Sequence, residues 1–210
     1  MTINKWGGLA SFLLAVSFVV APFIYLTGNL REAIGVFAYD LADFLYGPIL
    51  SASLIVVTYV LRERIGESAF RRMDLALLAA VLSAVGMAAV AFIRASNRHY
   101  HLTHPELNLE NSTTVFIVWT TLVAGVNAIG FHFLGWAFVL LGSASWTTHL
   151  FPRLINVFYI LAGVSSLFVY LFPDIEGLVL SLGTIISVWQ GVFLWKFDIR
   201  KYTQAGEYSS

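Results

Sequence analysis

The chain has 210 residues, of which 59% are hydrophobic and only 11% are charged. A soluble domain of this length could not cover its surface with so few charges, so the composition indicates an integral membrane protein. The formal net charge is zero, which argues against a basic surface for nucleic acid. The absence of cysteine excludes disulfides, thiolate metal sites and thiol nucleophiles.

Six apolar segments approach or exceed the length of about 20 residues that a membrane-spanning helix needs. They are Gly7–Leu26, Asp43–Leu61, Leu75–Ile93, Val115–Trp146, Leu154–Phe172 and Gly177–Trp195. The predicted fold is therefore all-α: a polytopic membrane protein with six transmembrane helices, in which residues 1–196 form one domain and 197–210 a polar cytoplasmic tail. The first segment is interpreted as a retained helix, because its apolar run is long for a signal peptide and little charge precedes it. The fourth is too long for the hydrocarbon layer and must tilt, bend or protrude.

The basic residues predict the orientation of these segments. With the N-terminus inside, nine of the twelve Lys and Arg residues fall on the inner side: Lys5, Arg62, Arg64, Arg71, Arg72, Arg153, Lys196, Arg200 and Lys201. The outer side holds the other three: Arg31, Arg94 and Arg98. This bias predicts that both termini are cytoplasmic. Arg94 is expected to end the third helix and to extend outward to the interface.

Small and polar residues recur at helical spacing in the fourth and fifth segments. In the fourth they are Thr114, Thr121, Gly125, Ala128, His132, Gly135 and Gly142, and in the fifth Asn156, Tyr159, Gly163, Ser166 and Tyr170. Such faces are typical of helices that pack against protein within a membrane. The large residues of the fourth segment are then expected to face lipid: Phe131, Phe133, Leu134, Phe138 and Leu141.

His132 is the main candidate for an internal polar site. A polar group buried in lipid-like surroundings needs a partner, and the expected partners are Asn156, Tyr159, Ser166, Ser83 or Ser51. Such a histidine is either a packing hydrogen bond or a ligand or proton site, and the hypothesis places it in a partly hydrated pocket. Asn127 is a further ligand-binding candidate, although it lies about 140° around the helix from His132.

Asp40 and Asp43 lie three residues apart and therefore share a helical face. One interpretation is that they cap and anchor a helix at the water boundary, where a carboxylate is much less costly than at the bilayer centre. The alternative is that they form the acidic mouth of the pocket that contains His132, and both are retained as ligand-binding candidates.

The predicted outer loop Ala95–Thr113 contains three histidines within six residues: His99, His101 and His104. With Glu106 or Glu110 they could ligate a transition metal. Their spacing matches no helical metal motif and Pro105 argues for an irregular loop, so a solvated loop is the favoured interpretation and no cofactor is expected. Asn111-Ser112-Thr113 is a formal glycosylation sequon, and Ser112 or Thr113 could also cap the fourth helix.

The junction of the fourth and fifth segments resembles a family of bacterial six-helix integral membrane proteins known only as a domain of unknown function. The matching features are Leu141-Gly142, Phe151-Pro152-Arg153 and Ala162-Gly163-Val164, with a second helix that ends at Leu61-Arg62. The resemblance implies a six-helix fold in a bacterial cytoplasmic membrane. It implies no activity and no functional residues.

These observations favour a carrier or binder with an internal polar pocket for a small or lipid-like ligand. The alternatives are a metal-dependent membrane enzyme that uses the outer histidine loop, and a structural subunit of a membrane complex, as a homo- or hetero-oligomer. Enzyme activity is not favoured, because Ser143 and Ser145 lie near His149 without an acidic partner or a nucleophile elbow. The expected partners are the lipid bilayer and the ligand, and no nucleic acid.

Overall fold

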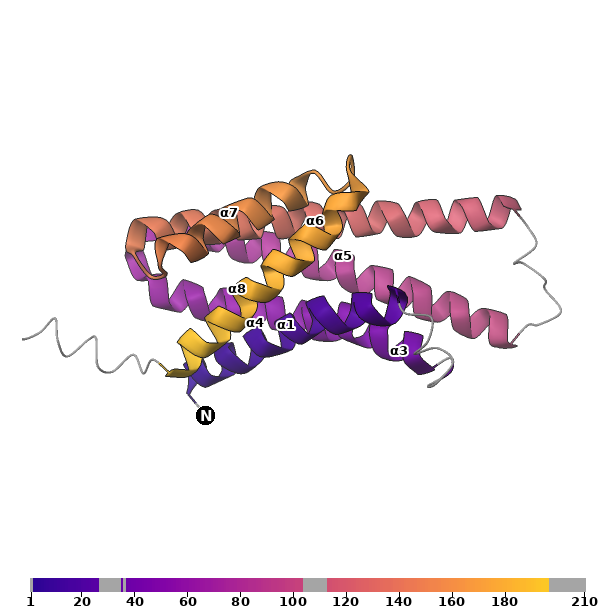
Figure 1. Ribbon diagram of the computed structural model, residues 1–210, viewed down its shortest axis with the longest axis horizontal. Coiled ribbons are helices and arrows are strands. Elements are labelled where there is room, and N and C mark those ends of the chain that lie inside the picture. Colours follow the sequence, from indigo (N-terminus) through magenta and orange to yellow (C-terminus); the bar gives the residue numbers. More distant parts are fainter. Residues whose placement is uncertain (1, 27–34, 36, 104–112, 197–210) are drawn as a thin grey trace, which may run out of the picture.

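The computed structural model describes residues 2–26, 35, 37–103 and 113–196, and this part of the chain consists of helices joined by short turns, without a strand (Figure 1). The long helices are α1 (Ile3–Leu26), α4 (Leu50–Ile65), α5 (Phe70–Thr103), α6 (Thr113–Thr148), α7 (Arg153–Leu167) and α8 (Glu176–Lys196). Shorter elements are α3 (Phe37–Phe44), the π-helical turn η1 (Leu45–Ile49) and the 3-10 turns η2 (Gly66–Ala69) and η4 (Pro173–Ile175).

Five helical segments within the described residues are long and apolar enough to cross a membrane. They are Ile3–Tyr25, Phe37–Ile65, Phe70–Tyr100, Ile117–Thr148 and Pro173–Lys196. The all-α, polytopic fold predicted from the sequence is thus confirmed at this level.

The fifth predicted span, Leu154–Phe172, is shorter than expected. Helix α7 has 15 residues and rises about 22 Å, less than the roughly 30 Å of hydrocarbon. It ends because the amides of Phe168 and Val169 bond to the carbonyls of Ser165 and Ser166, at 3.0 and 3.4 Å. These bonds join residues that are three apart in the sequence, so they tighten the last turn and end the α-helix. The connection that follows is also apolar, and composition alone does not distinguish it from a helix.

The helical segment that contains the second span begins before Asp43, because α3, η1 and α4 form one continuous helical segment of 29 residues. Pro48 lies in η1, where the wider turn accommodates a residue without an N–H. A methyl group at Gly47 would lie 2.4 Å from the Cβ atom of Ala91. The absence of a side chain at Gly47 therefore lets this turn lie directly against α5.

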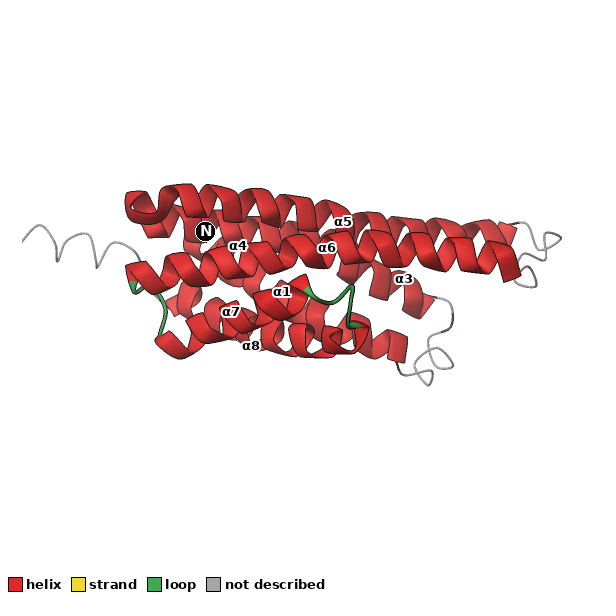
Figure 2. Cartoon of the chain, turned by 90° about the horizontal axis from the view of Figure 1, so that it is seen from above, coloured by secondary structure: helices red, strands yellow, loops and turns green. Residues whose placement is uncertain are grey.

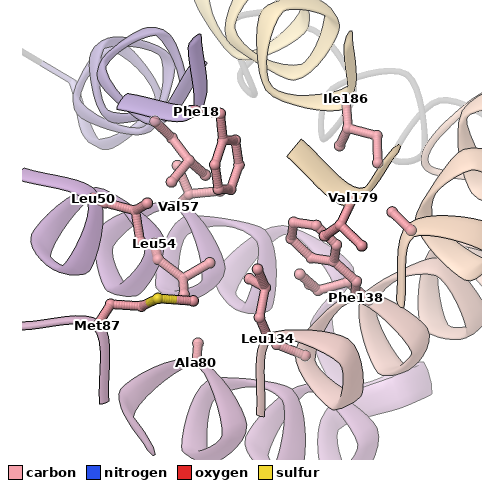
Figure 3. Packing of buried hydrophobic residues seen from close by; sticks show 14 of the residues in the cluster. Phe18, Leu50, Leu54, Val57, Ala80, Met87, Leu134, Phe138, Val179 and Ile186 are labelled. Atoms are coloured by element: carbon pink, nitrogen blue, oxygen red, sulfur yellow. The ribbon is translucent and has the colours of Figure 1, made fainter. Parts of the chain in front are cut away.

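The six long helices form a closed ring in which each packs on the next, in the order α1, α4, α5, α6, α7, α8 and back to α1. Buried side chains fill the interior of the ring. Figure 3 shows Leu54 of α4, Met87 of α5 and Leu134 of α6 turned toward this centre, with Phe18 and Val179 from α1 and α8. The ring places the ends of helices that are distant in sequence side by side.

Helix α1 starts and α8 ends at the same end of the bundle, and α5 and α6 extend beyond the other helices at the opposite end (Figures 1 and 2). We call this opposite end, with Tyr25, Phe37, Thr103 and Thr113, the distal end. Helices α5 and α6 have 34 and 36 residues and are each longer than about 50 Å, so they exceed the hydrocarbon thickness.

The prediction of an irregular loop from residue 95 onward is wrong for residues 95–103, which continue α5. No proline or glycine interrupts this stretch, and the Thr103 hydroxyl donates to the carbonyl of His99 at 3.0 Å. The extension also carries Arg98, which is held by carboxylates of α3.

The prediction that the large residues of α6 face lipid is also wrong for four of the five. Phe131, Leu134, Phe138 and Leu141 are at most 2% exposed. Helix α6 lies between α5 and α7 and borders the centre of the ring, so most of its circumference is covered along residues 130–145, where these four side chains lie.

The small-residue face of α6 meets α7 only along its C-terminal half. A methyl group at Gly135 would lie 2.7 Å from the carbonyl oxygen of Gly163, and one at Gly142 would lie 2.8 Å from the Cβ atom of Tyr159. Gly125 has no atom near enough to touch such a group. The predicted close packing is therefore confirmed at Gly135 and Gly142 and absent at Gly125, which lies in the half of α6 nearer the distal end.

Candidate functional site

A charged network joins α1, α3 and α5 near the distal end. The Arg98 guanidinium donates to Asp40 Oδ1 from Nε and Nη2, at 3.0 and 2.7 Å, and from Nη2 to Asp43 Oδ2 at 2.6 Å. The Tyr25 hydroxyl donates to Asp43 Oδ1. Asp43 is 3% exposed, so two partners, one on each oxygen, satisfy a nearly buried carboxylate, as burial of a charge requires.

The two aspartates thus share one basic partner, as their spacing on one helical face suggested. Asp40 is in the first turn of α3, where the helix dipole favours an anion, and its side chain is exposed. Asp43 points into the bundle and contacts α1 and α5. Neither interpretation made from the sequence describes the pair fully, because Asp40 suits a helix end at the water boundary and Asp43 ties helices together.

Beside this network, two tyrosines support a second arginine. The guanidinium carbon of Arg94 lies 5.1 Å from the ring centre of Tyr25 and 5.9 Å from that of Tyr46. Both distances allow cation–π attraction. The Tyr46 hydroxyl donates to Asn127 Oδ1 at 2.5 Å, which links η1 to α6 and fixes the ring beneath Arg94.

A pocket of about 900 Å³ lies next to these tyrosines, mainly between α1 and the first half of α8. Its lining residues are Phe18, Val19, Pro22, Phe23, Tyr25, Tyr46, Arg94, Glu176, Gly177, Leu180, Ser181, Thr184 and Ile185. Val19, Phe23 and Ile185 are about half exposed, so the pocket opens sideways between the two helices. A volume of this size is within the range of small-molecule sites in proteins.

The charged groups of the pocket lie at one end, where α8 begins. Arg94 and Glu176 are its only charged lining residues among the described part of the chain. The hydroxyls of Ser181 and Thr184 bond to carbonyls of their own helix, both at 2.7 Å. The pocket therefore combines mostly apolar walls with a charged end, which we call the pocket head and define by Tyr25, Tyr46, Arg94 and Glu176.

The two charges of the pocket head are close enough to interact electrostatically but do not form an ion pair. No described carboxylate lies within 4.0 Å of the Arg94 guanidinium, and no described basic nitrogen lies within 4.0 Å of the Glu176 carboxylate. Glu176 is the first residue of α8, and the positive end of the helix dipole stabilises its charge.

His132 lies elsewhere, and its hydrogen bond differs from the one expected. Its Nε2 accepts a bond from Trp136 Nε1 of the same helix at 3.2 Å, and the Trp136 side chain is exposed. Three of the expected partners bond to carbonyls instead: Ser166 Oγ donates to Phe131 at 2.7 Å, Ser51 Oγ to Ala84 at 2.8 Å, and Asn156 Nδ2 to Phe151 at 3.2 Å. The predicted bond from His132 to a neighbouring helix is therefore wrong.

Asn156 and Tyr159 form a third group, near the turn between α6 and α7. Asn156 Nδ2 donates to the carbonyl of Phe151 at 3.2 Å and helps to hold that turn. The Tyr159 hydroxyl donates to Gln190 Oε1 of α8 at 2.6 Å, and both side chains are buried. These contacts have an evident packing role.

The six ligand-binding candidates therefore lie in three separate places, and none of them lines the pocket: His132, Asn127, Asn156, Tyr159, Asp40 and Asp43. Asn127 and Asp43 adjoin it, because each accepts a hydrogen bond from a tyrosine of the pocket head. Whether any of the six binds a ligand stays a prediction.

The metal interpretation also stays a prediction. His99 is exposed on α5 and His101 lies in the same helix, whereas His104, Glu106 and Glu110 lie outside the described residues, as does most of the sequon. Within the described ranges no group of three or more His, Asp or Glu side chains is placed to hold a metal ion.

The sequence did not identify Arg94 and Glu176 as a pair. Each stood at a predicted helix boundary, where a charged residue is ordinary. The one feature of the sequence that relates the two residues is that both helix boundaries lie at the same predicted membrane surface, the outer one. Placing both in one pocket also requires knowing that α1 packs on α8, which is a contact between opposite ends of the chain.

Comparison of this chain with protein-family models, with curated proteins and with solved structures finds no match in any of the three.

Proposed function

We propose that this protein is a membrane-embedded binder or carrier of an amphiphilic, lipid-like ligand, which occupies the pocket between α1 and α8. The observation that carries the proposal is the division of the pocket into apolar walls and a charged head. A ligand with an apolar chain and a polar end matches both parts, and the sideways opening allows entry from the lipid layer.

The depth of the pocket head supports this proposal. Leu75 is an exposed apolar residue near the start of the long apolar stretch of α5. Arg94 follows 19 residues later in the same helix, which places it about 28 Å further along the axis. This distance is close to the roughly 30 Å hydrocarbon thickness, which supports a position for Arg94 where lipid headgroups begin.

The test uses two tryptophan substitutions on the same face of α8. Ser181 lines the pocket and Val188, two turns further along, does not, and both residues are exposed. We expect purified wild-type protein and Val188→Trp to retain amphiphile after mild detergent extraction, measured by native mass spectrometry. We expect Ser181→Trp to lose it because the indole fills the pocket, with thermal unfolding as the check on folding. Equal retention by both variants would contradict the proposal.

A further inference from the structure

We propose that the pocket head selects a zwitterionic ligand, with its anionic group at Arg94 and a primary ammonium group at Glu176. This inference rests on the function proposed above and specifies the chemistry of the ligand. The ligand class is an amphiphile whose headgroup carries a phosphate and a primary amine.

Arg94 is the group that would bind the anion. The nearby Arg98 is bonded to two carboxylates, whereas Arg94 lines the pocket with no described carboxylate within 4.0 Å. The rings of Tyr25 and Tyr46 hold its guanidinium in position. A guanidinium presents several N–H donors in a fixed plane, which suits a phosphate or a carboxylate.

Glu176 is the group that would bind the amine. Its carboxylate lines the same end of the pocket and has no basic nitrogen of the described chain within 4.0 Å. A primary ammonium donates three hydrogen bonds to such a carboxylate, whereas a quaternary ammonium donates none. The site should therefore favour an ethanolamine-type headgroup over a choline-type one.

The local charge balance also favours a zwitterion. Two cations and three carboxylates lie in or beside the pocket head: Arg94, Arg98, Asp40, Asp43 and Glu176. A ligand with only a negative charge would add to this net negative charge, and a ligand with only a positive charge would leave Arg94 without an anion. A zwitterion neutralises both pocket charges, and an unpaired charge in a mostly apolar pocket is costly.

The experiment measures headgroup preference with the full-length protein. The protein is placed in lipid nanodiscs that contain equal amounts of phosphatidylethanolamine, phosphatidylcholine and phosphatidylglycerol with the same acyl chains, and retained lipid is identified by native mass spectrometry. We expect the ethanolamine lipid to be enriched about tenfold over each of the others, which corresponds to about 1.4 kcal/mol.

Two charge-removing variants assign the roles. Glu176→Gln should abolish the preference for the ethanolamine lipid over the glycerol lipid, and Arg94→Gln should weaken retention of all three. Asp174→Asn and Arg71→Gln are matched controls, because both residues are exposed and lie outside the pocket, Asp174 in η4 just before α8 and Arg71 in α5. Both controls should keep the wild-type preference, and thermal unfolding shows which variants remain folded.

A soluble competitor distinguishes the source of the zwitterion. Glycerophosphoethanolamine carries the headgroup without acyl chains, and we expect it not to displace the bound lipid at millimolar concentration. Displacement would support the zwitterionic site and assign it to a soluble ligand.

Equal enrichment of the three lipids in the wild type, with retention still sensitive to Ser181→Trp, would overturn the zwitterion inference and leave the amphiphile function intact. No amphiphile binding at all would contradict both. Equal destabilisation by Arg94→Gln and Glu176→Gln with an unchanged preference would overturn the inference, because the two residues would then serve folding and not ligand selection.

Discussion

Arg98 shows how a single side chain can hold three segments of this protein together. Its guanidinium bonds to both aspartates of α3, and Asp43 in turn receives a bond from Tyr25 of α1. Asp43 is almost fully buried, whereas the side chain of Asp40 is 53% exposed. Because water screens an exposed ion pair, the two carboxylates should contribute very different amounts to stability.

We therefore expect Asp43→Asn to lower the free energy of unfolding by about 1–3 kcal/mol, because the substitution removes the buried charge to which both Arg98 and Tyr25 are hydrogen-bonded. Asp40→Asn is the matched control, since it removes an exposed partner of the same arginine, and should cost less than about 1 kcal/mol. Thermal or denaturant unfolding in detergent micelles measures both. Equal losses would show that the burial of Asp43 has no energetic consequence.

His132 gives a second prediction at the residue scale. Its hydrogen bond joins it to an exposed tryptophan of its own helix, and it does not line the α1–α8 pocket. His132→Leu should therefore change stability by less than about 1 kcal/mol and leave amphiphile retention unchanged. Loss of amphiphile retention in a folded His132→Leu protein would show that this histidine takes part in binding, as the sequence had suggested.

Helices α6 and α7 depend on two glycines for their close contact. A side chain at Gly135 would meet a carbonyl oxygen at 2.7 Å and a leucine side chain at 2.9 Å, so the helices would have to separate. We expect Gly135→Ala to destabilise the protein by about 1–3 kcal/mol through overpacking. Gly125→Ala on the same helix meets no neighbour and should be neutral or stabilising by up to about 1 kcal/mol. Unfolding in detergent compares the two, and a larger loss at Gly125 would contradict the packing described.

The sequence was informative about the elements and less so about their partners. Apolar length located the long helices, because hydrocarbon solvation requires it. It could not show that α7 stops at Leu167, since the exposed residues of the following turn, such as Phe168 and Leu171, are as apolar as the helix. It also could not orient α6, because large residues such as Phe138 suit lipid and a protein core equally well. The pocket required the α1–α8 contact, which local patterns do not encode.

At the scale of the whole molecule, the closed ring brings the start of α1 and the end of α8 to one end of the bundle (Figure 1). The nine basic residues assigned to the inner side predict that this end is cytoplasmic. A reporter fused after Ser210 should therefore report a cytoplasmic position, and a reporter inserted near Leu102 should report the opposite side. Reporters on the same side would contradict this topology.

The short α7 has a consequence for the membrane itself. Its roughly 22 Å rise falls about 8 Å short of the hydrocarbon thickness, and the turn that follows exposes Phe168, Tyr170 and Phe172. Four amides of this turn bond to nearby carbonyls, but a helix end leaves carbonyls without intrahelical partners and lipid tails cannot bond them, so the turn should reach the headgroup layer. The bilayer should accordingly be thinner along this side of the protein, and the surface would dip beside the start of α8. Lipid headgroups would then lie closer to the mouth of the pocket. The protein would thus deform the same bilayer from which its amphiphilic ligand enters.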